Sequence, residues 1–451
     1  MERESFKSRL GFLLVSAGCA IGIGNVWRFP YMIGKNGGCI CVLFYLFFLL
    51  IMGVPIMTME LAVGRASRKS AVLAYKTLEK KNTKWHIHGW FCMLGCYFLM
   101  MYYTSVSGWM LNYFIKFLCG EFKNNMTTQE ISSVFENMLA SPKEMTFYMF
   151  LTVLLGFAAC AKGVQKGLEK ASKFMMAVLF LLILVLSAHS FFLPGFKAGI
   201  KFYFVPNFNT MHEIGLKNII SSAMTQAFFS LSLGVAALEI FGSFMSKEHK
   251  LTGEAIKICC LDTFVAIMAG LIIFPACFSF GINVDEGPSL IFMTLPNVFV
   301  NMRGGKIWGS LFFLFMKFAS LSTVMAVFEN LISFCCDTFG WTRKKSVIIN
   351  FLFVFIMSLP CVFGFNILKN FMLFGKNILE IEDFIVSNLL LPLGSLVYLL
   401  FCVNDKYGWG FKNYLQEANT GVGIGMSERF AFYLKYLLPY LLIMVFINGL
   451  L

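Results

Sequence analysis

The chain has 451 residues, of which 58% are hydrophobic, 17% aromatic and only 14% charged, with a net charge of +13. Soluble globular proteins carry charges on nearer a quarter of their residues, so this composition is typical of a membrane protein and excludes secreted and nucleic-acid-binding classes. A membrane-spanning helix takes roughly 20 apolar residues, so eleven such helices would use about half of the chain and leave only short loops.

Apolar runs separated by polar or charged turns predict the transmembrane helices. Eleven such runs are present, and we therefore expect an all-α polytopic membrane protein. In chain order they cover about residues 11–33, 39–62, 90–117, 145–160, 174–193, 218–242, 255–281, 307–334, 347–367, 378–402 and 430–450.

The first run has small residues where a spanning helix would be deepest in the membrane. Gly18, Gly22 and Gly24 lie here, followed by Asn25. One interpretation is a broken helix, since unwound backbone in hydrocarbon is tolerated only where it lines a cavity or binds a ligand. The other is a close helix-packing face of the Gly-xxx-Gly kind. The run alone does not decide between them.

The sixth run is interrupted in a similar way by Ser230, Ser232 and Gly234. Taken alone it favours helix packing. Taken together, however, interruptions in a first and a sixth helix predict a five-helix unit repeated with inverted topology. That arrangement places a substrate site near the midplane of the bilayer.

The seventh run contains a carboxylate, Asp262, with no neighbouring Lys or Arg. A carboxylate at this depth needs a cation, a proton or a polar cavity. A protonated Asp262 in an interhelical hydrogen bond is the alternative to a functional site.

Basic residues are distributed unevenly between the loops. If the N-terminus is cytoplasmic, the loops on that side hold most of the 37 Lys and Arg residues. Because such residues gather in cytoplasmic loops, this bias predicts a multi-pass protein of the cell (inner) membrane with the N-terminus inside and the C-terminus outside.

Several motifs in chain order resemble the signatures of the neurotransmitter:sodium symporter family, and they cover nearly the whole chain in the order and spacing of that family. The eleven spans, without a twelfth, resemble its short bacterial amino-acid transporters. The motifs are residues 9–11 (RLG), 17–31 (AGCAIGIGNVWRFPY), 36–38 (NGG), 53–55 (GVP), 64–65 (GR), 102–103 (YY), 163–170 (GVQKGLEK), 226–234 (QAFFSLSLG) and 287–290 (GPSL), together with Glu60 and Trp109.

The resemblance implies a five-plus-five inverted-repeat transporter fold with broken helices 1 and 6, plus an eleventh transmembrane helix. The implied parts are a cytoplasmic N-terminal segment (1–10), the first five-helix repeat (11–193), the second repeat (194–402), and a cytoplasmic loop with the eleventh helix (403–451). The implied function is sodium-coupled symport of a hydrophobic or aromatic L-amino acid by alternating access, and not an enzyme activity. Tyrosine, phenylalanine, tryptophan and leucine are the expected substrates.

The resemblance also implies an amino-acid pocket and two sodium ions. The substrate residues would be Ala20, Gly22, Gly24, Leu99, Tyr103, Phe229, Ser230, Ser232, Val235, Thr323 and Val327. The first sodium would contact Ala20, Asn25, Ser230 and Asp262, and the second Gly18, Ile21, Ala319, Ser322 and Thr323.

Departures from other family members at four positions bear on ions and substrate. Chloride-dependent relatives have Asn where this chain has Asp262, and a chloride-binding Ser where it has Ala266. The fixed charge of Asp262 would therefore replace chloride, so no chloride requirement is expected. Monoamine carriers have Asp where this chain has Gly22, so an α-amino acid is expected. Val235 replaces a Phe of the bacterial leucine transporter, leaving volume for large side chains.

The resemblance assigns gates to both ends of the pathway. Arg28 and Asp383 would form the outer ion pair, and Arg3 and Asp337 the inner one. The alternative for Arg3 and Asp337 is that they are ordinary loop charges, since surface pairs contribute roughly 0 to 1 kcal/mol.

Helical geometry gives an independent view of the eighth run. At about 100° per residue, Ala319, Ser322 and Thr323 fall on one face and Lys317 on roughly the opposite face. Lys317 is therefore not expected to touch sodium, yet a lysine at this depth must be paired, hydrated or neutral. The alternative for the Ser322–Thr323 pair is hydrogen bonding to its own helix.

Other chemistry is poorly represented in the sequence. The chain lacks the GxxxxGK[ST] loop that binds ATP, so transport would draw on an ion gradient. The remaining alternatives are proton coupling, a channel, and a multi-span membrane enzyme.

Overall fold

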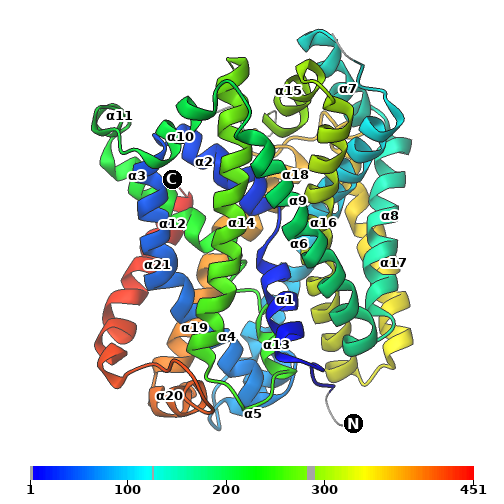
Figure 1. Cartoon of the computed structure of the whole chain (residues 1–451). Coiled ribbons are helices and arrows are strands. Elements are labelled where there is room, and N and C mark those ends of the chain that lie inside the picture. The colour runs from blue at the N-terminus through cyan, green and yellow to red at the C-terminus, as the bar shows by residue number, and fades with distance from the viewer. Residues whose placement is uncertain (1–3, 124–125, 282–289, 451) are drawn as a thin grey trace.

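The computed structural model describes residues 4–123, 126–281 and 290–450, which form a bundle of helices (Figure 1). The N-terminal segment lies at one end of the bundle with α5, α13 and α20, and α7, α11 and α15 lie at the other. In chain order the elements are α1 (Arg9–Ala20), η1 (Gly24–Arg28), α2 (Phe29–Lys35), α3 (Cys39–Phe48), η2 (Leu49–Gly53), α4 (Val54–Ser67), α5 (Ala71–Leu78), α6 (His86–Cys119), α7 (Thr128–Ala140), α8 (Pro142–Cys160), η3 (Val164–Glu169), α9 (Lys170–Ser190), α10 (Phe196–Phe204), α11 (Phe208–Ile214), α12 (Leu216–Ser230), α13 (Glu239–Ser243), α14 (Leu251–Phe280), η4 (Leu290–Thr294), α15 (Leu295–Asn301), α16 (Gly305–Phe339), α17 (Arg343–Phe363), α18 (Ile378–Phe384), η5 (Ile385–Leu390), α19 (Leu391–Val403), α20 (Phe411–Ala418), η6 (Glu428–Phe430), η7 (Tyr433–Leu437) and α21 (Leu438–Leu450).

The predicted spans coincide with these helices. Within the described residues, eight continuous helical segments and one bent pair are long and apolar enough to cross a membrane. The two other predicted spans, 90–117 and 218–242, fall on the 34-residue α6 and on α12 with α13. The chain is thus an all-helical, multi-span membrane protein.

The first membrane-spanning helix is broken in its middle. Helix α1 ends at Ala20, and the chain becomes helical again at Gly24, with an angle of 55° between the two arms. The Ile21 N–H still donates to Ala17 O at 2.7 Å, but Ile21 itself is extended (φ −68°, ψ 103°), which ends the helix. Of the two interpretations of this run, the broken helix is confirmed.

The 218–242 segment is also interrupted, because eight residues separate the end of α12 at Ser230 from the start of α13 at Glu239. Within this gap Ser232 (φ 51°) and Ala236 (φ 60°) have left-handed backbone, and Gly234 has φ 101°. Left-handed conformations of non-glycine residues cost about 1–3 kcal/mol each and persist only where the surroundings enforce them.

Side chains of three neighbouring helices hold the unwound 231–238 segment. The buried Glu60 of α4 accepts hydrogen bonds from the Gly234 N–H and, at 3.3 Å, from the Leu238 N–H. Asn330 Nδ2 of α16 donates to Ala236 O at 3.0 Å, and Cys96 Sγ of α6 lies 3.2 Å from Val235 O. These contacts replace the helical hydrogen bonds that the segment lacks, which water cannot do inside a bilayer.

Candidate functional site

The two helix breaks face each other across a small cavity in the centre of the bundle. The cavity has a volume of about 20 Å³, and α6, α16 and α19 complete its walls. It is lined by Ala20, Gly22, Gly24, Leu99, Tyr103, Phe229, Ser230, Ser232, Thr323 and Leu391.

Nine of these ten lining residues belong to the predicted substrate set, and Leu391 is the tenth. Of the predicted set, Val235 and Val327 are buried but do not line the cavity. Val235 packs on α6, because a β-carbon added to Gly95 would lie 2.8 Å from Val235 Cγ1. The sequence argument about free volume at Val235 therefore concerns a side chain that packs beside Gly95 and does not line this cavity.

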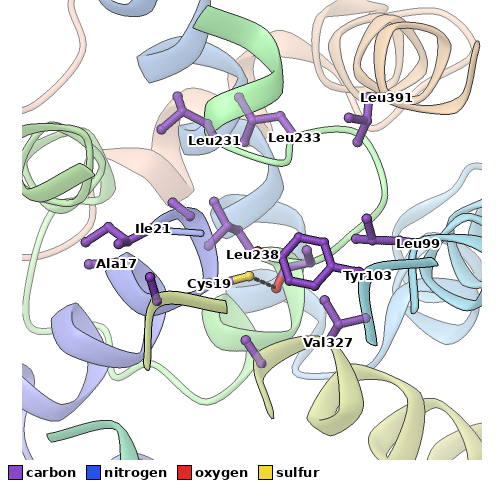
Figure 2. Packing of buried hydrophobic residues seen from close by; sticks show 14 of the residues in the cluster. Ala17, Cys19, Ile21, Leu99, Tyr103, Leu231, Leu233, Leu238, Val327 and Leu391 are labelled. Carbon is purple, nitrogen blue, oxygen red and sulfur yellow. Dashed lines mark hydrogen bonds between the residues drawn. The ribbon is translucent and has the colours of Figure 1, made fainter. Parts of the chain in front are cut away.

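Leu391, the first residue of α19, is a wall residue that sequence reasoning missed. It is 3% exposed, lines the cavity together with Leu99 and Tyr103, and lies above Leu99 at the upper right of Figure 2. Helix α19 approaches the unwound segment closely because Gly394 has no side chain, and a β-carbon there would overlap Gly234 O. A β-carbon at Gly234 would in turn overlap Leu391 O, so glycines on both segments permit this approach.

Backbone N–H groups of the first break point into the site. The Ile23 N–H donates to the Tyr103 hydroxyl at 3.0 Å, and the Gly22 N–H donates to Asn25 Oδ1 at 3.1 Å. Glycine is required at position 22, because a β-carbon there would overlap the Tyr103 hydroxyl and Thr323 Oγ1. N–H groups at the start of a half-helix are suited to an anionic group such as a carboxylate.

Oxygen atoms suited to a hard cation gather beside this cavity. Asn25 Nδ2 donates to Asp262 Oδ1 at 2.8 Å and to Asp262 O at 3.1 Å, and the Tyr45 hydroxyl lies 3.2 Å from Ser230 Oγ. Asp262 is fully buried, and within the described part of the chain its Oδ2 has no hydrogen-bond partner. A buried carboxylate with an unpartnered oxygen fits a cation, and Ala20 lies on the adjacent cavity wall.

All five residues predicted for the second sodium meet between α1 and α16. Thr323 Oγ1 donates to Gly18 O at 3.3 Å and to Ile21 O at 3.2 Å. Ser322 Oγ lies 3.5 Å from Ile21 O and donates to Ala319 O at 2.8 Å. Ser322 thus bonds to its own helix, as the alternative interpretation expected, but both hydroxyls also reach across to α1. Carbonyl and hydroxyl oxygens are ligands suited to sodium.

A larger cavity of about 600 Å³, here called the vestibule, adjoins the central cavity and shares Gly24, Tyr103 and Phe229 with it. The predicted outer gate residues both line it. The Arg28 guanidinium lies 3.9 Å from the centre of the Phe229 ring, and Asp383 accepts a hydrogen bond from Ser387 Oγ at 2.7 Å. The salt bridges of the described chain do not include an Arg28–Asp383 pair.

At the opposite end, the N-terminal segment is held against several helices. Phe6 packs on Phe241 and Phe244, and its N–H donates to Phe244 O at 3.2 Å. Of the predicted inner gate, Asp337 accepts the Ser70 N–H at 2.7 Å, whereas Arg3 lies outside the described residues. The 287–290 motif (GPSL) also lies largely outside them, since 282–289 are not described.

The comparisons with known proteins agree with these features. The profile of the Sodium:neurotransmitter symporter family matches residues 3–134 and 124–451. The chain belongs to this family. It is 32% identical to the uncharacterized sodium-dependent transporter YhdH of Bacillus subtilis (strain 168) over 443 residues, covering 98% of this chain and 96% of YhdH. It is 30% identical to an uncharacterized sodium-dependent transporter of Haemophilus influenzae, covering 100% of this chain and 98% of that protein.

A solved structure has the same fold. The crystal structure of MhsT in complex with L-phenylalanine superimposes with a TM-score of 0.88 at 32% identity, covering 99% of this chain and 100% of MhsT. The fold is therefore MhsT-like, and the protein is a sodium-dependent transporter rather than an enzyme.

Proposed function

We propose that this transporter is a sodium-coupled symporter that imports a hydrophobic or aromatic L-amino acid by alternating access. The observation that carries the proposal is the meeting of three sets of groups at the two helix breaks. They are backbone N–H groups beside the Tyr103 hydroxyl, the oxygens around Asp262, and the carbonyl and hydroxyl cluster of α1 and α16. An amino acid and two sodium ions need these three chemistries.

In the proposed complex the substrate carboxylate binds the N–H groups after the first break and the Tyr103 hydroxyl. The substrate amine binds carbonyl oxygens of the two breaks, because Gly22 provides no side-chain carboxylate for it. Leu99, Phe229 and Ser232 then face the substrate side chain, with Leu391 as an additional wall. The binding of L-phenylalanine by MhsT supports a substrate of this class.

Two sodium ions travel with the substrate in this proposal. The first contacts Asp262, Asn25, Ser230, Ala20 and the substrate carboxylate. Ion and substrate therefore share a contact, and each raises the affinity for the other by the same factor. The second ion joins α1 to α16 through Gly18, Ile21, Ala319, Ser322 and Thr323.

The proposed arrangement of the chain is two inverted five-helix repeats, 11–193 and 194–402. They are preceded by a cytoplasmic segment, 1–10, and followed by a cytoplasmic loop and an eleventh helix, 403–451. The C-terminus lies outside. Arg28 with Asp383 closes the vestibule, and Arg3 with Asp337 closes the cytoplasmic end.

Uptake by proteoliposomes tests the coupling. We expect accumulation of radiolabelled L-phenylalanine, L-tyrosine, L-tryptophan or L-leucine under an inward sodium gradient, and none under a proton gradient alone. Accumulation with protons alone would instead indicate proton coupling. Transport that only equilibrates the substrate, whatever the gradient, would indicate a channel.

Chloride independence is the second part of the proposal. In this proposal Asp262 carries a negative charge when the first sodium is bound, at a position beside Ser230 and Tyr45 where chloride-dependent relatives are expected to use an anion. Sodium-driven uptake should therefore continue at an unchanged rate when gluconate replaces chloride. A marked loss of uptake in gluconate would overturn this part and leave sodium coupling intact.

A further inference from the structure

Lys317 is a buried lysine that the proposed binding groups do not use. It lies in α16 and is 3% exposed. Its Nζ donates to Ser107 O at 3.2 Å, to Ser107 Oγ at 3.0 Å and to Thr152 Oγ1 at 2.7 Å. Ser107 belongs to α6 and Thr152 to α8, and no salt bridge of the described residues includes Lys317. One side chain of α16 thereby joins two other helices.

A fourth residue completes this network. Ser320 Oγ lies 2.7 Å from Ser107 Oγ and donates to Lys317 O at 3.0 Å. Lys317, Ser107, Thr152 and Ser320, here called the lysine network, are each at most 3% exposed. A lysine amino group inside a membrane is costly unless its donors are satisfied, and here neutral oxygens satisfy them.

The lysine network lies next to both proposed binding groups. On α6, Ser107 is one helical turn after Tyr103, which lines the substrate cavity. On α16, Ser320 lies in sequence between Ala319 and Ser322, two of the residues proposed for the second sodium, here called the second sodium cluster. Because residues four apart lie on the same helix face, fixing Ser107 against α16 also fixes where Tyr103 stands relative to that cluster.

The two binding groups meet directly at one contact. The Tyr103 hydroxyl contacts the Thr323 side chain. The two groups lie so close to Gly22 that a β-carbon there would overlap both of them. Thr323 Oγ1 in turn donates to Gly18 O and Ile21 O. A shift of α6 along α16 by one residue, about 1.5 Å, would break this contact.

We propose that Lys317 is a positioning residue that sets the register of α6 on α16 and thereby couples the substrate cavity to the second sodium site. The proposal rests on the proposed function. Lys317 touches neither ion nor substrate, and acts by holding Tyr103 and Thr323 in contact. Its loss should weaken the mutual effect of sodium and substrate more than the binding of either ligand alone.

The test measures substrate binding to purified protein at saturating and at low sodium. The wild type is first titrated with L-phenylalanine, L-tyrosine, L-tryptophan and L-leucine, and the tightest ligand is used thereafter. The ratio of the dissociation constants at low and saturating sodium gives the coupling factor. Lys317→Met keeps an unbranched side chain that is one atom shorter but removes the donors, and should reduce this factor about fivefold or more. Ser107→Ala should act in the same direction.

Thr104→Ala is the matched control. Thr104 is also a buried hydroxyl of α6, but it faces α17, lying 3.1 Å from Ser358 Oγ and donating to Met100 O at 2.8 Å. Its loss should leave the coupling factor unchanged.

A lower melting temperature of Lys317→Met with an unchanged coupling factor would overturn the inference and leave Lys317 a structural residue. If Lys317→Met does not fold, the coupling factor of Ser107→Ala decides by the same criterion. A wild type without sodium-dependent binding of any of the four amino acids would overturn the proposed function itself, and that outcome is distinct from an unchanged variant.

Discussion

Gly22 shows how a single missing side chain shapes the site. Its backbone passes so close to α6 and α16 that any β-carbon would overlap the Tyr103 hydroxyl and Thr323 Oγ1. Gly22→Ala should therefore abolish substrate binding, as measured by titration of purified protein. Gly18→Ala is the comparison, because a β-carbon there would lie 3.2 Å from Ser322 Cβ. It should raise the sodium concentration needed for half-maximal binding while preserving substrate binding at saturating sodium.

Leu391 should limit the size of the substrate side chain, since it forms a cavity wall beside the second helix break. Leu391→Ala removes three carbon atoms and should favour L-tryptophan over L-leucine about tenfold in uptake competition, a range typical for changes of this size in an apolar pocket. Leu393→Ala, on the same helix but 40% exposed, should leave the preference unchanged. An unaltered preference in Leu391→Ala would show that the substrate side chain does not reach α19.

At the scale of the elements, the conformation of the unwound 231–238 segment is held by hydrogen bonds to Glu60 of α4. The carboxylate accepts from the Gly234 and Leu238 N–H groups, which have no helical acceptor. Glu60→Gln leaves one oxygen for two donors and should destabilise the protein by about 1–3 kcal/mol. A lower melting temperature in detergent would report this loss.

Glu130 provides the control for that measurement. It caps α7 by accepting the Thr127 N–H at 2.7 Å, but it is exposed at the surface. Glu130→Gln should change the melting temperature little. Equal effects of the two substitutions would contradict a special role of Glu60 in holding the break.

Hydropathy locates the long helices well, because each one must bury a continuous apolar length in the bilayer. The small residues around Gly22 indicated either a break or a close packing face in the first helix, and that run alone could not decide between the two. Hydropathy does not reveal the short surface helices α7, α10, α11 and α20, since they are not long apolar runs. Nor does it explain the break after Ser230, which is held by Glu60 and Asn330 from distant parts of the chain.

The residues of the candidate site were likewise predictable from the sequence only in part. Residues within the broken helices could be named from their motifs, and the structure brings nine of the predicted substrate residues to one cavity. Leu391 and the partners of Lys317 could not be named. Lys317 bonds to Ser107 and Thr152, which are 210 and 165 residues away in the chain, and sequence spacing carries no information on such contacts.

At the scale of the whole molecule, the two ends of the transport pathway differ. Near α18 the vestibule reaches down to Tyr103 and Phe229. At the other end Phe6 packs across α13, and Arg9 pairs with Glu254 of α14 at 2.5 Å. Alternating access requires that these contacts break when the vestibule closes, so the opening of one end should oppose that of the other.

Cysteine labelling can follow closure of the vestibule. Leu379 lines this cavity, and Leu379→Cys should react with a membrane-impermeant thiol reagent in sodium-free buffer. Sodium together with an amino-acid substrate should slow the labelling reaction about tenfold. The reason is that the first sodium and the substrate carboxylate contact each other in the proposed complex, and their joint binding favours the state in which the vestibule is closed. Of the described native cysteines, Cys119 and Cys260 are exposed and would first be replaced by Ser.

Phe374→Cys separates closure from a general change in reactivity. Phe374 is 92% exposed and is not among the residues lining the vestibule, so its labelling rate should be the same with and without ligands.

Asp262→Asn tests whether closure of the vestibule depends on the first sodium, since it keeps the shape of the side chain but removes the charge expected to hold that ion. In that background Leu379→Cys should stay reactive in the presence of both ligands. Protection that persisted without the Asp262 charge would show that closure does not depend on the first sodium.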